Sequence, residues 1–361
     1  MKTLDFKYYI SLVLIAFAMG FVSCSDSDNN APEASIEENT IDFTINFEGD
    51  NGEALSSQGD LSQFVTVKYK GVTYAVVEGE REAGKIGFNL ITDNDGKKQL
   101  VFGGIDGTKE VENEKILIDC ANGTTNEITF SNKKVVGRSG EGFVRTYSFN
   151  GQPLESPDVI CPFEYNSYLA TEQINGGVFN YLIKIKMLDK SGNDLLADDK
   201  FRIMVKEGTT FTFRGVTSPI VAVDKIYTDP NGYNLEGLQE WQNNWEEYKK
   251  KTKYKLKIET EKKKDGTTDA IVAFGYFSTI YFYRDQELVI NWFDGSKDVV
   301  KFTLIFMPKY FTDPTYSSYN PEAPQQEFNM TCNGEEVTYG TVPPKHITLQ
   351  FTINKTFDWW E

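Results

Sequence analysis

The sequence predicts a mainly β protein built from two tandem antiparallel β-sandwich domains, with immunoglobulin-like topology as one arrangement that the strand count allows. Three observations lead to this fold class. Short segments alternate apolar and polar residues, as half-buried strands do. Turn pairs such as Asn122-Gly123 and Asn150-Gly151 separate these segments at spacings typical of antiparallel sandwiches. Strands do not alternate with helices along the chain, which disfavours parallel α/β folds.

The composition is that of a globular chain for which nucleic acid is not an expected partner. Of 361 residues, 40% are hydrophobic and 25% are charged, unlike a disordered or collagen-like chain. Acidic residues outnumber basic residues by 53 to 37, and the formal net charge is −16. Such a polyanion repels nucleic-acid phosphates. The single histidine excludes a zinc site that needs several histidines.

The first residues, 1–23, have the layout of a secretion signal. Two lysines precede an apolar run at residues 8–22, which is shorter than the roughly 20 residues that span a bilayer as a helix. The string FVSC, which ends at Cys24, resembles the lipobox of bacterial lipoproteins. In that family the cysteine becomes the acylated first residue of the mature protein.

The residues behind Cys24 extend this resemblance. Residues 25–30 read SDSDNN and are similar to the surface-export signal of lipoproteins in the Bacteroides group. The resemblance implies an outer-membrane lipoprotein that is exposed at the cell surface. Its acylated N-terminus would enter the lipid bilayer, where several acyl chains give durable anchoring. Residues 24–40 would then form a solvated tether. An ordinary signal peptide with an incidental cysteine is the alternative.

An internal repeat divides the rest of the chain into two domains, 41–176 and 177–361. Five blocks of sequence match between the two copies in the same order, which chance resemblance between β domains explains poorly. The first block aligns IDFTINFEGDNGEAL, from Ile41, with YLIKIKMLDKSGNDL, from Tyr181. Apolar residues alternate in both strings, so each predicts an opening strand followed by a glycine turn.

The later blocks place further strands. The string FVTVKYKGVTYAV, from Phe64, is aligned with FRIMVKEGTTFTF, from Phe201, which predicts matching strands. The string ILIDCANGTTNEITF, from Ile116, aligns without a gap with LVINWFDGSKDVVKF, from Leu288. The segments that read as strands include residues 86–91, 99–105, 115–120, 127–130, 143–149, 255–259, 279–283, 301–306 and 346–353.

The second domain carries an insertion, 214–253, with a different pattern. Residues 234–250 read NLEGLQEWQNNWEEYKK, and their apolar members recur every three or four positions. This spacing predicts a short amphipathic helix with Trp241 and Trp245 on one face. The helix either docks on a sheet or offers the two rings as a platform for a sugar ring or a partner protein.

Other tryptophans stand where loops are expected. Trp292 enters a hairpin tip, and Trp359 and Trp360 follow the last expected strand. Aromatic rings on loops stack on sugar C–H faces and anchor protein interfaces, whereas the same rings can also seal the ends of a sandwich. Together with Trp241 and Trp245, these three residues are the candidate binding residues.

The sequence contains no motif that indicates catalysis, a cofactor or a metal. Cys120, Cys161 and Cys332 form no C-x-x-C pair, so a cysteine metal site or redox motif is not expected. They are either small buried hydrophobes or one disulfide and a free thiol. The turn at 93–96 opens like a calcium loop but has glycine where an EF-hand requires glutamate. His346 lies in an expected strand.

These observations predict a lipid-anchored, non-catalytic binding module for a glycan or an envelope protein partner, with no cofactor and no metal. A structural or adhesive spacer made of tandem sandwiches is the alternative. An open groove that awaits a donor strand, or an unpaired C-terminal strand, would favour this alternative. A carboxylate-dependent glycoside hydrolase is a third candidate, and it requires a cleft with two acids about 5–9 Å apart.

Overall fold

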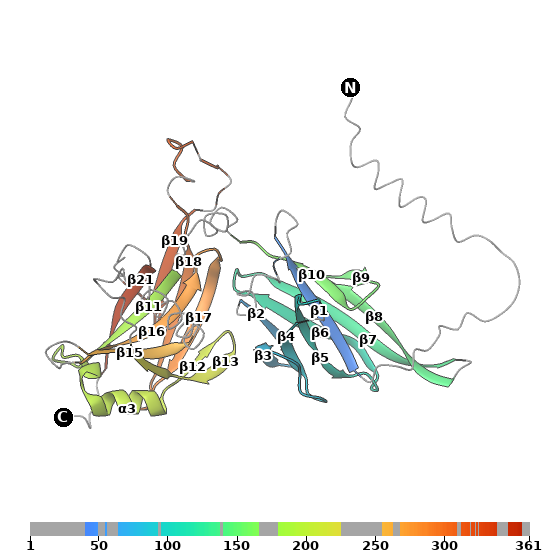
Figure 1. Ribbon diagram of the computed structural model, residues 1–361, viewed down its shortest axis with the longest axis horizontal. Coiled ribbons are helices and arrows are strands. Elements are labelled where there is room, and N and C mark those ends of the chain that lie inside the picture. Colours follow the sequence, from blue (N-terminus) through green and yellow to red (C-terminus); the bar gives the residue numbers. More distant parts are fainter. Residues whose placement is uncertain are drawn as a thin grey trace, which may run out of the picture.

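The computed structural model of the chain is mainly β and forms two successive sandwiches, which Figure 1 shows side by side. Strands are the dominant element in the part of the chain that the structure describes. That part consists of residues 40–49, 55, 64–92, 95–137, 140–165, 180–224, 255–262, 268–308, 312–317, 319–321, 323, 325–337 and 346–355.

The strands of the first sandwich are β1 (Thr40–Glu48), β2 (Val65–Tyr69), β3 (Val72–Glu78), β4 (Gly87–Thr92), β5 (Lys98–Asp106), β6 (Val111–Cys120), β7 (Thr125–Gly137), β8 (Gly140–Phe149), β9 (Gln152–Leu154) and β10 (Asp158–Pro162). They pair in the order β10-β1-β5-β4-β3-β2-β6-β7-β8-β9. Strand β3 belongs to both halves, because residues 72–75 pair with β2 and residues 76–78 pair with β4. It therefore closes one side of the sandwich, and the other side is open between β9 and β10.

The second sandwich contains β11 (Asn180–Leu188), the 3-10 turn η2 (Leu195–Ala197), α3 (Asp199–Gly208), β12 (Thr210–Phe213), β13 (Val216–Pro219), β14 (Val221–Asp224), β15 (Leu256–Lys262), β16 (Thr268–Ser278), β17 (Tyr283–Asn291), β18 (Lys297–Ile305), β19 (Glu327–Cys332), β20 (Glu335–Glu336) and β21 (His346–Asn354). One sheet has the order β14-β15-β16-β11-β21 and the other β13-β12-β17-β18-β19-β20. The second sandwich is thus open between β20 and β21.

The two sandwiches have the same topology, strand by strand. The pairing orders correspond as β1 with β11, β2 with β12, β3 with β13 and β14, β4 with β15, β5 with β16, β6 with β17, β7 with β18, β8 with β19, β9 with β20, and β10 with β21. Most pairings are antiparallel, as expected. The parallel pairings also correspond, because β1·β10 matches β11·β21 and β3·β4 matches β14·β15. The internal repeat is therefore a repeat of structure.

Individual hydrogen bonds confirm the gap-free block of the repeat. The Cys120 N–H donates to the Thr124 carbonyl at 2.9 Å, and the Trp292 N–H donates to the Ser296 carbonyl at 2.9 Å. In both turns the side-chain oxygen of the residue before the glycine, Asn122 or Asp294, accepts from the backbone N–H two residues later, at 3.0 Å. Equivalent turns are thus built by equivalent bonds, although the residues differ.

One predicted block of the repeat is wrong, because residues 201–208 belong to helix α3 and form no strand. The side chain of Asp198 caps this helix and accepts from the Phe201 N–H at 2.9 Å. Phe201 and Val205 lie one helical turn apart, and both are buried. A short string in which every second or fourth residue is apolar fits a helix and a strand equally well, so periodicity alone did not decide this segment.

The true counterpart of the β2–β3 hairpin is the β12–β13 hairpin. Lys70 and Gly71 turn the first hairpin with φ of 48° and 80°, and Arg214 and Gly215 turn the second with φ of 51° and 76°. The repeat therefore continues through Asp224, so the insertion does not begin at 214, and the connection from β14 to β15 is longer than that from β3 to β4.

Several sequence predictions fall outside the described residues. These are the signal segment 1–23 with its lipobox, Cys24, most of the tether 24–40, the domain boundary at 176 and 177, the predicted helix at 234–250 with Trp241 and Trp245, and the pair Trp359 and Trp360.

The two sandwiches meet through the β6–β7 turn of the first and the start of β17 in the second. The Ala121 carbonyl accepts from the Arg284 N–H at 3.0 Å and from the side chain of Gln286 at 3.1 Å. The Arg284 guanidinium also donates to the Asn122 carbonyl at 3.1 Å and to the Glu164 carboxylate at 2.8 Å. These bonds fix the orientation of one sandwich relative to the other.

A second arginine and an aromatic contact complete this junction. Arg214, whose side chain is 6% exposed, donates to the Asp119 carbonyl at 2.6 Å and pairs with its carboxylate at 3.2 Å. The rings of Phe64 and Tyr281 lie 4.1 Å apart, one from each sandwich. A buried guanidinium held by several acceptors is costly to expose, so the junction resists bending.

Helix α3 covers the end of the second sandwich that corresponds to this junction. Its Phe201 ring meets the Phe293 ring edge-on at 5.5 Å. Its Gly208 approaches so closely that an added Cβ would lie 2.5 Å from the Phe293 Cβ. The gap-free block places Phe293 at the position of Ala121. In the first sandwich this position contacts the second sandwich, and in the second sandwich it contacts α3. Figure 1 shows α3 at that end, below β12 and β15.

Candidate functional site

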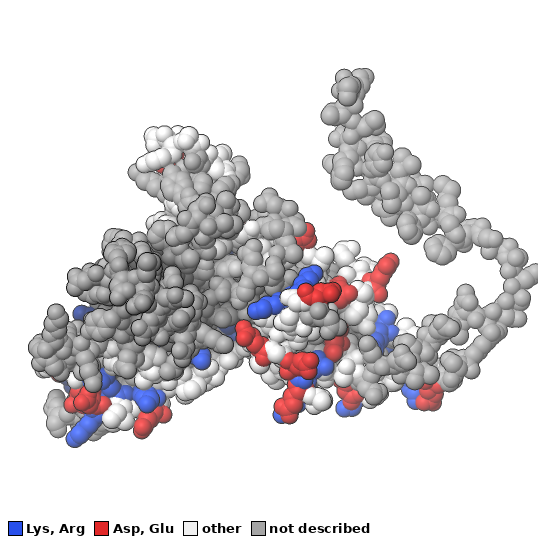
Figure 2. Space-filling view, in the orientation of Figure 1, with Lys and Arg blue, Asp and Glu red and all other residues white. Residues whose placement is uncertain are grey.

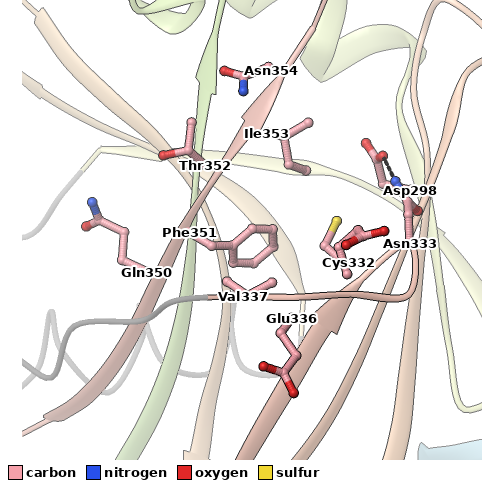
Figure 3. Close-up of a pocket in the computed structure, with 11 residues that line it drawn as sticks. Asp298, Cys332, Asn333, Glu336, Val337, Gln350, Phe351, Thr352, Ile353 and Asn354 are labelled. Atoms are coloured by element: carbon pink, nitrogen blue, oxygen red, sulfur yellow. Dashed lines mark hydrogen bonds between the residues drawn. The ribbon is translucent and has the colours of Figure 1, made fainter.

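A pocket of about 480 Å³ lies at the open side of the second sandwich, between β20 and β21. This volume is in the range of small-ligand sites. In Figure 3, Asp298 and Asn333 lie on one side of the pocket, Gln350 and Thr352 lie on the other, and the Phe351 ring lies between them. The lining residues are Asp298, Cys332, Asn333, Glu335, Glu336, Val337, Gln350, Phe351, Thr352, Ile353 and Asn354.

Asp298 is the centre of a buried polar cluster at this pocket. Its Oδ2 accepts from the Trp292 Nε1 at 2.5 Å and from the Lys355 Nζ at 2.8 Å, and its Oδ1 accepts from the Asn333 Nδ2 at 2.7 Å. Burial by itself would raise the pKa of Asp298, but the hydrogen bonds from Lys355, Asn333 and Trp292 outweigh burial and lower the pKa. The carboxylate is therefore ionised and fully held.

Trp292 is buried, so it fits the second of the two alternatives that the sequence left open, a ring that seals the sandwich, and not an exposed ring for a ligand. Its side chain is only 3% exposed. The Lys355 Nζ lies 5.2 Å from the ring centroid, within the range of a cation–π contact. The indole N–H is used by Asp298. Trp292 thus packs beneath the site and orients its carboxylate, and its ring is not available for stacking on a sugar.

Lys355 has an identifiable counterpart in the first sandwich. The Lys355 N–H donates to the Leu188 carbonyl at the end of β11, at 2.9 Å. The Phe163 N–H donates in the same way to the Glu48 carbonyl at the end of β1, also at 2.9 Å. Phe163 and Lys355 therefore occupy equivalent positions just after the last strand of each sandwich.

This equivalence shows that the cluster is specific to the second sandwich. Its charged and indole members are replaced in the first sandwich by neutral residues: Asn126 stands for Asp298, Cys120 for Trp292, and Phe163 for Lys355. Asn150 stands for Asn333 and keeps the same backbone bond to the neighbouring strand, at 2.8 Å in both copies. The turn is thus common to both copies, and the ion pair is not.

The strand that borders the pocket is unusual for an edge strand. β21 has nine residues, HITLQFTIN, with no proline, lysine, arginine or acid. Among the described strands it pairs only with β11, in parallel along its whole length. Its counterpart β10 has five residues, begins at Asp158 and ends at Pro162. Charges, proline and short length are the usual means of blunting an edge, and β21 uses none of them.

The three cysteines of the body are free thiols of low reactivity. Cys120 and Cys161 are buried, and Cys332 lines the pocket. Burial raises the pKa of Cys120 to about 12 and that of Cys332 to about 11, and it raises the pKa of Cys161 as well. The thiols are therefore protonated at neutral pH, when a nucleophile would need to be a thiolate.

The described residues give no sign of a metal site. They contain no group of three or more His, Cys, Asp and Glu placed to hold a metal ion. On the face that Figure 2 shows, acidic and basic side chains are interspersed over the first sandwich. In the same residues, no helix is long and apolar enough to cross a membrane.

Asp298, Asn333 and Lys355 are not predicted as site residues by the sequence, although one signal was present. Asp298 and its counterpart Asn126 stand at aligned positions of the gap-free block and are both buried, at 4% and 5% exposure. A polar residue at a core-facing position in both copies marks a site that must be hydrogen-bonded.

Comparison of the chain with known protein families, curated proteins and solved structures finds no match.

Proposed function

We propose that the protein is a lipid-anchored, non-catalytic binding module of the bacterial outer membrane, and that it binds its partner at the pocket between β20 and β21. The observation that carries this proposal is the difference between the two sandwiches at equivalent positions. The first sandwich reaches the same topology with neutral residues at these positions. A buried ion pair costs desolvation and is seldom needed for stability, so its presence beside a pocket in only one copy supports a role in binding.

The chemistry of the pocket supports binding over catalysis. A glycoside hydrolase needs one carboxylic acid with a raised pKa to protonate the leaving group, whereas the pKa of Asp298 is lowered by its three donors. Glu335 and Glu336 are adjacent in β20, and adjacent strand residues point to opposite faces. They are therefore poorly placed to converge on one bond. Cys332 is a protonated thiol for the reason given above.

The proposed location of the protein is supported by its N-terminal segment. The apolar run, the lipobox-like string and the acidic stretch support export and acylation at Cys24. A surface anchor favours partners of the envelope or its surroundings, which are glycans or proteins. Mass spectrometry of the protein from its native membrane tests this part, because an N-terminal acylated Cys24 is expected. A soluble chain without acyl groups would contradict it.

The binding site is tested with a matched pair of variants. Thr352 is exposed, lines the pocket and is equivalent to Ile160 of β10, because each stands at the same register against its neighbouring strand. The mature chain with Cys24→Ser would be screened on a glycan array and on a displayed peptide library. Thr352→Arg should abolish any selective binding, and Ile160→Arg, on the first sandwich, should leave it intact. A folded wild-type chain with no selective binder, or with binding unaffected by Thr352→Arg, would contradict the proposal.

The junction between the sandwiches favours a second role, that of a rigid spacer. Arg214 and Arg284 bond from one sandwich to backbone and carboxylate groups of the other. Small-angle X-ray scattering should therefore fit one orientation for the wild type. The double variant Arg214→Ala with Arg284→Ala should show a broader distribution of distances between the sandwiches. An unchanged distribution would argue against a junction held by these arginines.

A further inference from the structure

We infer that the pocket accepts an extended strand from a partner protein, which carries basic side chains and adds to the edge of β21 that no other described strand pairs with. This inference rests on the proposed function, because it names the class of ligand for the same site. An open groove for a donor strand also favours the structural or adhesive alternative. Three features of the described residues support it: the edge of β21, the groove beside this edge, and the charges on the side of the groove opposite β21.

The first feature is the edge itself. An edge strand presents a row of backbone N–H and C=O groups, and natural proteins block such rows with charges, proline, bulges or short length. Strand β21 is nine residues long and has none of these features. The other strands at open sides are shorter, since β9 has three residues, β20 has two and β10 has five. β21 is thus the longest strand edge at the two open sides, and it borders the pocket.

The second feature is the direction of the pocket. Five consecutive residues of the chain, 350–354, line it. Successive side chains of a strand point to opposite faces. A pocket that contacts all five in succession therefore follows the edge of the strand, as a groove. At about 3.3 Å per residue, the lined stretch is roughly 16 Å long, which suits an extended peptide of about five residues.

The third feature is the chemistry of the groove. Its apolar members, Val337, Phe351 and Ile353, offer contacts to alternate side chains of an added strand. Glu335 and Glu336 are exposed on the side of the groove opposite β21. The charge of Asp298 is already paired with Lys355, so the two glutamates carry the unpaired charge nearest to the groove among the lining residues. A complementary strand alternates apolar residues with lysine or arginine.

The probe is a displayed library of random nine-residue peptides, matched to the nine residues of β21. It would be selected on the mature chain carrying Cys24→Ser and counter-selected on the same chain with Thr352→Arg. Selected peptides should alternate apolar residues with lysine or arginine. N-methylation of every second residue removes backbone donors and should weaken a selected peptide by about tenfold or more. Amide exchange at residues 350–354 should slow when the peptide binds.

Charge reversal gives a second, milder variant. Glu335→Lys with Glu336→Lys lies on an exposed two-residue strand, so the fold should be retained. Selected peptides should bind it more weakly, and the salt dependence of their binding should diminish. Ile160→Arg should bind as the wild type does.

The outcomes separate this inference from the proposed function. A selected peptide that binds equally well after N-methylation, or without slowing exchange at residues 350–354, overturns strand addition. A glycan that binds the wild type and not Thr352→Arg, with no peptide selected, also overturns strand addition and leaves the binding module standing. The absence of any selective ligand, glycan or peptide, overturns both.

Discussion

Replacing Lys355 by methionine should destabilise the protein by about 3 kcal/mol. The Lys355 Nζ lies 2.8 Å from Asp298 Oδ2, and the two side chains are 10% and 6% exposed. Removal of one partner from a buried pair typically costs about 3–5 kcal/mol, because a buried charge loses its compensation. Asp298 keeps the donors Trp292 and Asn333, and methionine keeps the apolar stem over the indole, so the lower end of this range applies.

The assay is guanidinium unfolding at pH 7, followed by far-UV circular dichroism, with the free energy of unfolding taken from the midpoint at constant slope. The control is Lys301→Met, which breaks a pair with Glu287 whose side chains are 65% and 49% exposed. This exposed pair should be worth about 0.5 kcal/mol or less. The double variant Lys355→Met with Asp298→Asn should recover part of the loss. A loss below about 1 kcal/mol for Lys355→Met would mean that the pair is solvated and that no desolvated ion pair marks this pocket.

Three further predictions concern the junction, the pH dependence and the thiols. Gly215→Ala places a Cβ 2.8 Å from the Thr73 Oγ1 at φ +76°, whereas Gly71→Ala has a φ of +80° and open space; both should lose about 1–3 kcal/mol through backbone strain, Gly215→Ala should lose more than Gly71→Ala because its Cβ also meets Thr73, and equal losses in a denaturation experiment would argue against a close contact at Gly215. The pKa of Asp298 lies below its unfolded value of about 3.9, so its contribution to stability is complete above about pH 5 and is lost as the pH falls through the folded-state pKa. Asp298→Asn should therefore flatten the fall in unfolding free energy between about pH 4 and pH 2, and an unchanged slope would count against this assignment. Because burial raises the pKa of Cys332 to about 11, iodoacetamide at pH 8 should label it slowly in the native protein and rapidly in denaturant, and fast native labelling mapped by mass spectrometry would refute the assignment.

The repeat and the fold class were accessible from the sequence where turns and alternation agree. The block from Ile116 aligned without a gap with the block from Leu288, and the strand pairings place these residues at equivalent positions. Turn residues with side-chain oxygens and glycine fix both the strand ends and the register. Such local signals are strong enough to define a sandwich even when one copy has Cys120 and the other has Trp292.

Other features depend on contacts that no local pattern contains. Residues 201–208 alternate well enough to resemble a strand, and the cap from Asp198 and the packing of Phe201 against Phe293 select the helix. Asp298 and Lys355 lie far apart in the sequence, and only the closure of the sandwich brings them together. Trp292 sits beside a hairpin turn, yet its indole N–H finds an acceptor inside. Long-range pairing of polar groups is set by tertiary structure, so spacing along the chain does not reveal it.

The position of α3 blocks the face of the second sandwich that corresponds to the junction face of the first. In the first sandwich, the small side chain of Ala121 leaves its carbonyl free to accept two bonds from the following unit. In the second, Phe293 stands at that position and is covered by Phe201 and Gly208 of the helix. A further sandwich could not dock at this position, because α3 already covers it. A further unit docked at this position in the same way would require deletion of the helix and a small residue at 293.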